Sequence, residues 1–257
     1  MKMFSLPIIL LAITLLSPQL ASAIVNVGQS VTDVKTDGMS HILHFGLDGA
    51  QGNTDKDTFK ADLLSQWRHG QYTEFLMLDR AYGKSSGAVN TDRAFVHLRH
   101  RTQINEAWAG EVFAQKGRDK FTRLSDRTLL GGGGRLRVIE EEGVSGLYVG
   151  LGAIYEWEKL SPTLGTSDTN SQLWRGNMYV MYKHQINDQV QVSSTTYIQP
   201  TLQNSNDYRL LEQAAFTVGM FENVKLKISV DYSFDAKPPQ TIGKDDVRYS
   251  SGLELRF

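Results

Sequence analysis

The amino-acid sequence predicts an all-β protein, a closed antiparallel transmembrane β-barrel of about 12 strands with short periplasmic turns and longer extracellular loops. Three observations predict this fold class. Apolar and polar side chains alternate along most of the chain, short connections alternate with long ones, and the last predicted strand ends on an aromatic residue, Phe257.

The alternation is clearest in residues 224–234, where apolar residues occupy the even positions and lysine, serine and aspartate the odd ones. Residues 39–48 and 190–199 alternate in the same way. In an extended strand this pattern places apolar groups on one face and polar groups on the other. No segment of comparable length has helical spacing, so the elements are expected to be strands.

Turn residues divide the chain into twelve predicted strands. These are expected at residues 39–51, 56–67, 72–82, 91–103, 107–116, 124–138, 144–158, 171–185, 189–199, 207–218, 224–234 and 245–257. Strands 72–82 and 207–218 alternate poorly, because adjacent apolar residues, among them Met77 and Leu211, put apolar groups on both faces.

The connections carry independent information about topology. Each even-numbered strand up to the tenth is followed by a short turn, and each odd-numbered strand from the third by a longer loop. The short turns are 68–71, 104–106, 139–143, 186–188 and 219–223. The longer loops are 83–90, 117–123, 159–170, 200–206 and 235–244. Only the first hairpin, 52–55, is out of step with a barrel whose termini both lie in the periplasm.

The N-terminal residues predict export. A basic start, a short apolar segment and small residues before position 24 predict a cleaved signal peptide over residues 1–23. Residues 24–38 are expected to form a periplasmic lead-in, and 39–257 a barrel in the outer membrane of a Gram-negative bacterium. The absence of cysteine excludes disulfides and a lipoprotein anchor. A net charge of −1 gives no reason to expect nucleic acid as a partner.

Alternation alone does not say which face looks outward, because a soluble barrel buries its apolar face and a membrane barrel turns it to lipid. Charges of both signs on the polar faces, tryptophans near strand ends and an aromatic C-terminus favour lipid. The candidate aromatic-belt residues are Trp67, Trp108, Trp157, Trp174 and Phe257. The expected partners are outer-membrane lipids and the barrel-assembly machinery, with a monomer favoured. A soluble periplasmic β-barrel binding protein is the alternative.

Three segments, in this order, resemble a known family. They are Gly-Asn-Thr-Asp at 52–55, Leu-Leu-Gly-Gly-Gly-Gly at 129–134 and Lys-Pro-Pro at 237–239 before a last strand ending in phenylalanine. These segments resemble the YdiY-like family of salt-induced outer-membrane proteins, over almost all of the mature chain. The resemblance implies the location and the fold, and, because that family has no known function, it supplies no catalytic residue. The chain departs from the family in ending Leu-Glu-Leu-Arg-Phe rather than in a more tyrosine-rich form.

No catalytic, metal-binding or cofactor-binding residue is predicted. The glycines at 131–134 precede no helix and therefore lack the geometry of a phosphate-binding loop. His41 and His44 fall on opposite faces of one strand, as do His97 and His100, so neither pair forms a chelate. A lipid hydrolase would need a lipid-facing histidine beside a serine, and this alternative is open at His41 or His100.

The interior of the barrel is the remaining candidate site. The lumen-facing candidates are Arg93, Arg99, Arg101, Glu111, Arg175, Lys225, Lys227, Asp231, Arg248, Glu254 and Arg256. Such charges either form a cationic lining that selects anions or pair with one another and seal the lumen. The sequence leaves both a narrow channel and a structural envelope-stress protein open.

Overall fold

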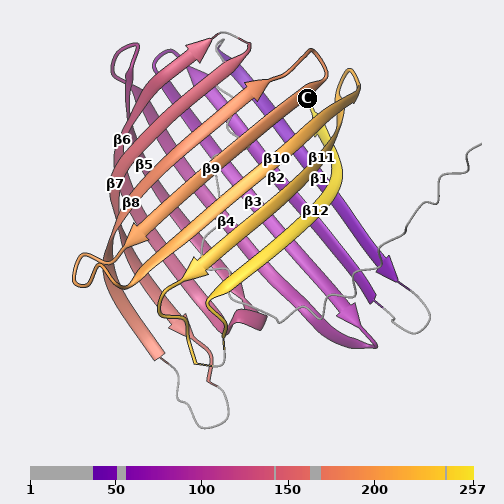
Figure 1. Ribbon diagram of the computed structural model, residues 1–257, viewed down its shortest axis with the longest axis vertical. Helices are drawn as coiled ribbons and strands as arrows, with labels where there is room; N and C mark the ends of the chain where they lie inside the picture. The colour runs from indigo at the N-terminus through magenta and orange to yellow at the C-terminus, as the bar shows by residue number, and fades with distance from the viewer. Residues whose placement is uncertain (1–36, 51–55, 142, 163–168, 241) are drawn as a thin grey trace, which may run out of the picture.

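The structure, a computed structural model, describes residues 37–50, 56–141, 143–162, 169–240 and 242–257. In this part of the chain twelve strands pair antiparallel in sequence order, and the last pairs with the first (Figure 1). The strands are β1 (Gly38–Ala50), β2 (Lys56–His69), β3 (Tyr72–Ser85), β4 (Ala88–Gln103), β5 (Trp108–Asp119), β6 (Leu124–Glu141), β7 (Ser145–Leu160), β8 (Thr169–Gln185), β9 (Val190–Pro200), β10 (Tyr208–Phe221), β11 (Val224–Asp235) and β12 (Asp245–Arg256). A short 3-10 helix, η1 (Lys120–Thr122), follows β5. The predicted closed barrel of twelve antiparallel strands is confirmed.

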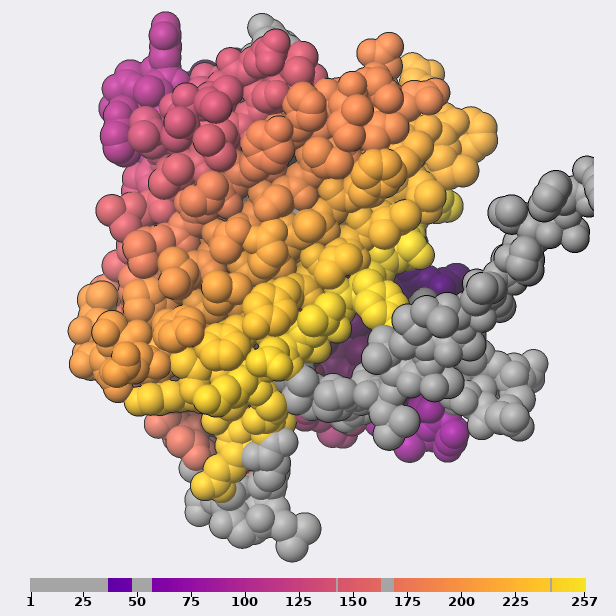
Figure 2. All heavy atoms as spheres, in the orientation of Figure 1, coloured from indigo at the N-terminus to yellow at the C-terminus, as the bar shows by residue number. Residues whose placement is uncertain are grey.

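Burial alternates along the strands as the sequence pattern predicts. In β11, Ile228 and Val230 are exposed, whereas Ser229 and Ser233 are buried. Because a closed barrel has one inner and one outer face, the buried polar positions point inward and the exposed apolar positions outward. Figure 2 shows the outer face of β8–β12 as a continuous layer of side chains. Among the described residues, no helix is long and apolar enough to cross a membrane.

Two ends of the barrel differ in their connections. At one end, which we call the short-turn end, β2–β3, β4–β5, β6–β7, β8–β9 and β10–β11 are joined by brief turns. At the other, the long-loop end, the longer connections lie at 120–123, 161–168, 201–207 and 236–244. The predicted hairpin at 52–55 lies outside the described residues, as do the predicted signal peptide at 1–23 and most of the lead-in.

The connection between β3 and β4 differs from the predicted loop over 83–90. Only Ser86 and Gly87 separate the two strands, and both have positive φ angles, 49° and 78°. Such left-handed residues reverse the chain tightly and keep the flanking strands paired. The prediction of a long loop here is therefore wrong. The polar residues on both sides of this turn belong to β3 and β4 and remain paired with each other.

The end of β6 also differs from the prediction, which places a turn at 139–143. The strand continues to Glu141, with a shift of register between Arg137 and Ile139. A bulge of this kind absorbs one residue and lets pairing continue beyond it. Glu140 then forms an ion pair with Arg137 within the strand instead of lying in a solvated turn.

The barrel closes at the short-turn end of its seam. Residues 42–45 of β1 pair with 253–256 of β12. Phe257 continues this pairing, because its backbone N–H donates to His41 over 3.1 Å and its carbonyl accepts from His41 over 2.8 Å. The C-terminal residue is thus part of the closure, which explains why the sequence keeps an alternating pattern to its end.

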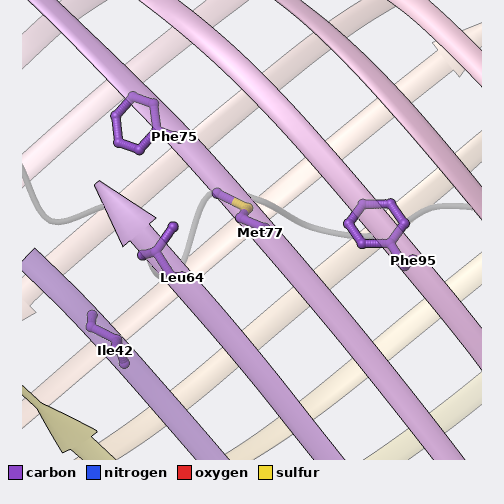
Figure 3. Close-up of a cluster of buried hydrophobic side chains, with 5 residues drawn as sticks. All are labelled: Ile42, Leu64, Phe75, Met77 and Phe95. Atoms are coloured by element: carbon purple, nitrogen blue, oxygen red, sulfur yellow. The ribbon is translucent and has the colours of Figure 1, made fainter. Parts of the chain in front are cut away.

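The interior contains an apolar cluster as well as charges. Ile42, Leu64, Phe75, Met77 and Phe95 project inward from the neighbouring strands β1–β4 and are buried together (Figure 3). This cluster explains why the strand around Met77 alternates poorly in sequence. A wholly polar interior, as the alternation suggests, is therefore only part of the structure.

The glycines at 131–134 lie within β6, and two of them leave room for neighbours on the inner face. A methyl group on Gly131 would collide with Phe113 and Ile154, and one on Gly133 would collide with the backbone of Leu151 and Gly152. Glycine in a strand often marks such a close approach. The run therefore serves packing between β5, β6 and β7, in agreement with the rejection of a phosphate-binding loop.

Candidate functional site

The eleven predicted lumen-facing residues all lie on described strands, and the burial of their side chains differs. Five are buried themselves, namely Arg99, Arg101, Glu111, Arg175 and Glu254. The other six are half-buried, namely Arg93, Lys225, Lys227, Asp231, Arg248 and Arg256. The structure gathers these side chains into groups with very different access to solvent.

The first group, which we call the Glu111 cluster, joins four strands. The Glu111 carboxylate on β5 accepts from Arg101 Nε over 2.7 Å and from Arg99 Nη1 over 3.3 Å, both on β4. Arg135 Nη1 on β6 lies 3.9 Å away. From β8, the Tyr179 hydroxyl donates to Glu111 over 3.0 Å. Because β6 and β7 separate β5 from β8 along the wall, this last bond passes through the interior.

Glycine on β7 makes the Tyr179 contact sterically allowed. Gly150 is the direct partner of Tyr179, and a methyl group on Gly150 would collide with the tyrosine ring. The ring therefore lies flat against the wall and its hydroxyl reaches Glu111. Arg135 is held by a cation–π contact, in which its guanidinium carbon lies 3.9 Å from the centre of the Tyr148 ring.

The second group, the Glu156 cluster, is centred on a carboxylate of β7 that is 0 % exposed. Glu156 accepts from Arg209 Nη1 over 2.8 Å and from Arg175 Nε over 3.3 Å, and it also pairs with Arg127. Three guanidiniums from β6, β8 and β10 therefore surround one carboxylate. Bonds between ionised partners are the stronger kind in proteins, and here they replace water around each charge.

Arg209 connects this cluster to a further strand. It donates from Nη2 to Glu158 over 3.1 Å on β7 and from Nε to Asp235 over 2.8 Å on β11. Its one planar group thereby bridges β7, β10 and β11 through the interior, which suits the fixed fork of guanidinium donors. Above it, at the long-loop end, Arg123 Nη1 donates to the Gln240 carbonyl over 3.0 Å and links two loops.

Several charged side chains on the strands next to the seam keep access to solvent. The side chain of Asp62 on β2 is 45 % exposed, although His44 Nδ1 lies 2.9 Å from it. On β12, Arg248 is 30 % exposed and Arg256 is 31 % exposed, each paired with a carboxylate of the same strand. We call the inner face of β11, β12, β1 and β2 the accessible side, and the Glu111 and Glu156 clusters the packed side.

Lys225 and Lys227 add positive charge to the accessible side. Both are half-buried on β11, opposite Glu254 and Gly252 of β12. Among the described residues, neither lysine forms an ion pair within 4.0 Å. Both lysines nevertheless have carboxylates nearby, Glu254 beside Lys225 and Asp62 beside Lys227.

Several members of the packed side are absent from the predicted set. These are Arg127, Arg135, Glu158, Tyr179 and Arg209. A signal for the first two exists in the sequence, because they occupy odd positions of β6 like the buried Leu129 between them. The sequence of a single strand does not predict which other strands its side chains contact across the interior.

The histidines lie where the period of two places them. His97 is buried inward and His100 is half-buried on the outer face, where it pairs with Glu74 over 2.8 Å. In the described part of the chain, no three metal-binding side chains are arranged to hold an ion. One contact was not predicted, between Ser145 Oγ and His184 Nδ1 over 2.8 Å at the short-turn end. Within the described residues no carboxylate is bonded to that histidine, so a serine–histidine–acid arrangement is not formed.

The predicted belt residues lie near strand ends. Trp67, Trp108, Trp174 and Phe257 are exposed, and Trp157 is half-buried. Trp157 and Trp174 pack on either side of Tyr155, with ring centres 4.4 and 5.0 Å from it. Three aromatic rings therefore form one outward group near the long-loop ends of β7 and β8.

Solved structures share this architecture at low sequence identity. The NanC porin matches with a TM-score of 0.52 and 9 % identity, covering 84 % of this chain and 98 % of that one. The translocator domain of autotransporter NalP from Neisseria meningitidis matches with a TM-score of 0.47 and 12 % identity, covering 88 % and 90 %. The KdgM porin matches with a TM-score of 0.43 and 10 % identity, covering 86 % and 99 %. The NanC match shows a porin-like barrel fold.

Sequence comparison places the chain more directly than structural comparison does. No curated protein matches the sequence. Residues 43–257, which include nearly the whole barrel, match the family model described as "Protein of unknown function, DUF481". The chain therefore belongs to the DUF481 family.

Proposed function

We propose that the protein spans the outer membrane of a Gram-negative bacterium and conducts small anions along the accessible side of its interior. The observation that supports membrane insertion is that apolar side chains lie on the outer face of the barrel and charged side chains on the inner face. Leu47 is 82 % exposed and Leu151 is 66 % exposed on the outside, while Glu156 and Arg175 are buried inside. In water this arrangement exposes apolar area and buries charge, whereas in a bilayer it satisfies both.

The closed sheet supports the same proposal. Hydrocarbon offers no partner for backbone N–H and C=O groups, so a sheet within it has to satisfy them internally. The antiparallel ladder does so from β1 through β12, and the seam is closed by pairing of residues 42–45 with 253–256. Residues 1–23 would direct export, the tryptophans would lie at the two headgroup layers, and the barrel-assembly machinery would insert the chain. The salt-induced character of the resembled family is included in this proposal.

The channel part depends on the contrast within the interior. Twelve strands enclose more space than a filled barrel of about eight strands, and the packed side occupies only part of it. Asp62, Arg248 and Arg256 keep exposed surface on the accessible side. There Lys225 and Lys227, which are not held in close ion pairs, supply positive charge that would favour anions over cations. The conduction path would therefore be narrow, lie along one side of the interior and prefer anions.

Conductance of the refolded protein in planar bilayers tests the proposal. We expect small, steady steps whose reversal potential in a salt gradient shows preference for the anion. A membrane barrel should also migrate differently in SDS before and after boiling and remain with the outer-membrane fraction of the cell. Recovery in the periplasmic extract would refute the membrane part, and an inserted barrel without conductance would refute the channel part alone.

A further inference from the structure

The outer surface at the long-loop end is not uniform around the barrel. On β7, β8 and β10 it carries aromatic residues, including Tyr155, Trp174 and Tyr208. On β3–β5 it instead carries four cations. We call them the basic patch, and they are Arg80, Lys84, Lys116 and Arg118. Near the membrane interface a barrel tolerates outward cations at little cost, and there they lie level with lipid headgroups.

The two arginines of the patch are held in a fixed arrangement. Arg80 of β3 pairs with Ala94 of β4, and Ala94 pairs with Arg118 of β5, so the three residues form one row across three strands. Two strand spacings separate the arginine backbones by about 10 Å. The small Ala94 between them leaves the space above it free of a large side chain.

One carboxylate orients both guanidiniums. Asp92 Oδ1 accepts from Arg80 Nη1 over 2.6 Å and is 3.2 Å from Arg118 Nη2. Arg80 also donates to the backbone carbonyl of Arg93 over 2.8 Å. These bonds limit the freedom of the two side chains, yet both guanidiniums keep N–H groups facing outward, because Arg80 and Arg118 are substantially exposed.

The patch has more positive than negative charge. Its four cations are accompanied by three outward carboxylates, Asp92, Asp126 and Asp57, the last directly opposite Lys84, which leaves a net charge of +1. Lys116 pairs with Asp126 over 2.8 Å, but both are exposed, and such pairs contribute little. Lys84 is exposed and forms no ion pair among the described residues. The two exposed arginines, about 10 Å apart, suit an anionic ligand that carries two separate negative groups.

We propose that the basic patch binds the phosphate groups of a bis-phosphorylated glycolipid, such as lipid A, in the outer leaflet. The inference rests on the proposed membrane insertion, in which the long-loop end faces outward and its outer surface lies among lipid headgroups. Basic residues at that level attract anionic headgroups. A glycolipid with two phosphates on one rigid headgroup contacts both arginines at once, whereas a lipid with a single phosphate contacts one. The glycolipid's acyl chains would lie along the apolar wall below the patch.

The test compares lipid binding by the wild type and three variants of the refolded full barrel in detergent micelles. The patch variant is R80Q/R118Q, and a second patch variant, K84Q/K116Q, leaves the Asp92 bonds intact. The matched control is K237Q/K244Q, which removes two exposed cations from the β11–β12 loop at the same end. Heat-dependent migration in SDS establishes that each form is folded, and native mass spectrometry measures bound lipid A.

We expect lipid A to bind R80Q/R118Q about thirtyfold more weakly than wild type, with a smaller loss for K84Q/K116Q and none for the control. Removal of both phosphates from lipid A should weaken binding to wild type by a similar factor. Equal binding by wild type and both patch variants would overturn the inference, as would equally tight binding of phosphatidylglycerol. Failure of the wild-type protein to insert into bilayers would instead refute the proposed function on which the inference rests.

Discussion

The two sides of the barrel interior use similar charged residues for different physical results. On the packed side, Glu156 is surrounded by three guanidiniums and is inaccessible to solvent. On the accessible side, Asp62 is bonded to His44 and Asp79 and keeps nearly half of its side-chain surface exposed. The comparison teaches that an interior charge by itself indicates neither a pore nor a seal. The number of partners and the access of water decide which of the two it serves.

The residues that build the two sides differ in a consistent way. The packed side relies on arginine, whose fork of donors reaches several carboxylates, as Arg209 reaches Glu156, Glu158 and Asp235. The free cations of the accessible side are Lys225 and Lys227, flexible groups that water can solvate. Glycines on β6 and β7 make room for large inward side chains on the packed side, and Gly252 of β12 makes room for His44 at the seam.

The largest expected effect concerns the stability of the two sides. Glu156→Gln removes the shared carboxylate and leaves Arg127, Arg175 and Arg209 buried without it, which should cost about 3–5 kcal/mol of unfolding free energy. The matched change Asp62→Asn, on the accessible side, should cost under about 1 kcal/mol. Urea unfolding of the barrel in lipid vesicles measures both. Equal losses for the two variants would show that the interior is not divided as described.

A second prediction concerns ion selectivity. K225E/K227E reverses two unpaired charges on the accessible side and should lower the anion-to-cation permeability ratio roughly tenfold. K84E/K116E makes the same change of charge on the outer surface and should leave that ratio unaltered. The reversal potential in a salt gradient gives the ratio. A barrel that conducts, but whose selectivity responds equally to both variants, would place the ion path elsewhere.

The smallest effect separates two adjacent glycines of β6. Gly133→Ala adds a methyl group that collides with the backbone of β7, and it should destabilise the barrel by about 1–3 kcal/mol. Gly134→Ala adds the same group on the outer face, where the nearest atom is a Trp108 carbon 3.7 Å away. That change should be within about 0.5 kcal/mol of neutral. Thermal unfolding of the two variants measures this difference. Equal stabilities would show that Gly133 is not needed for the close approach of β6 and β7.

Much of the fold was predictable because each strand carries its own pattern. The alternation in residues 224–234 sets the inner and outer faces of β11 without reference to any other strand, since side chains of a strand alternate by geometry. The predictions failed where the same residue types serve two structures. Polar residues near Ser86 and Gly87 continue the strands instead of forming a loop, and a bulge after Arg137 extends β6 beyond the predicted turn.

The candidate site was predictable only in part. Arg99, Arg101, Glu111 and Arg175 follow the inward period, but the sequence does not reveal that Tyr179 joins the Glu111 cluster from β8. It also left the choice between a lined pore and a salt-bridged seal undecided. The structure shows ion-paired packing on one side and accessible charge on the other.

The sequence by itself determined the number of strands, their order and the face that each residue takes, because these follow from local alternation and turn chemistry. Only the tertiary structure decided which charges meet. Closing twelve strands into a ring brings Arg209 of β10 to Glu156 of β7 through the interior, and such a contact depends on the curvature, the register and the side-chain volumes of the whole barrel.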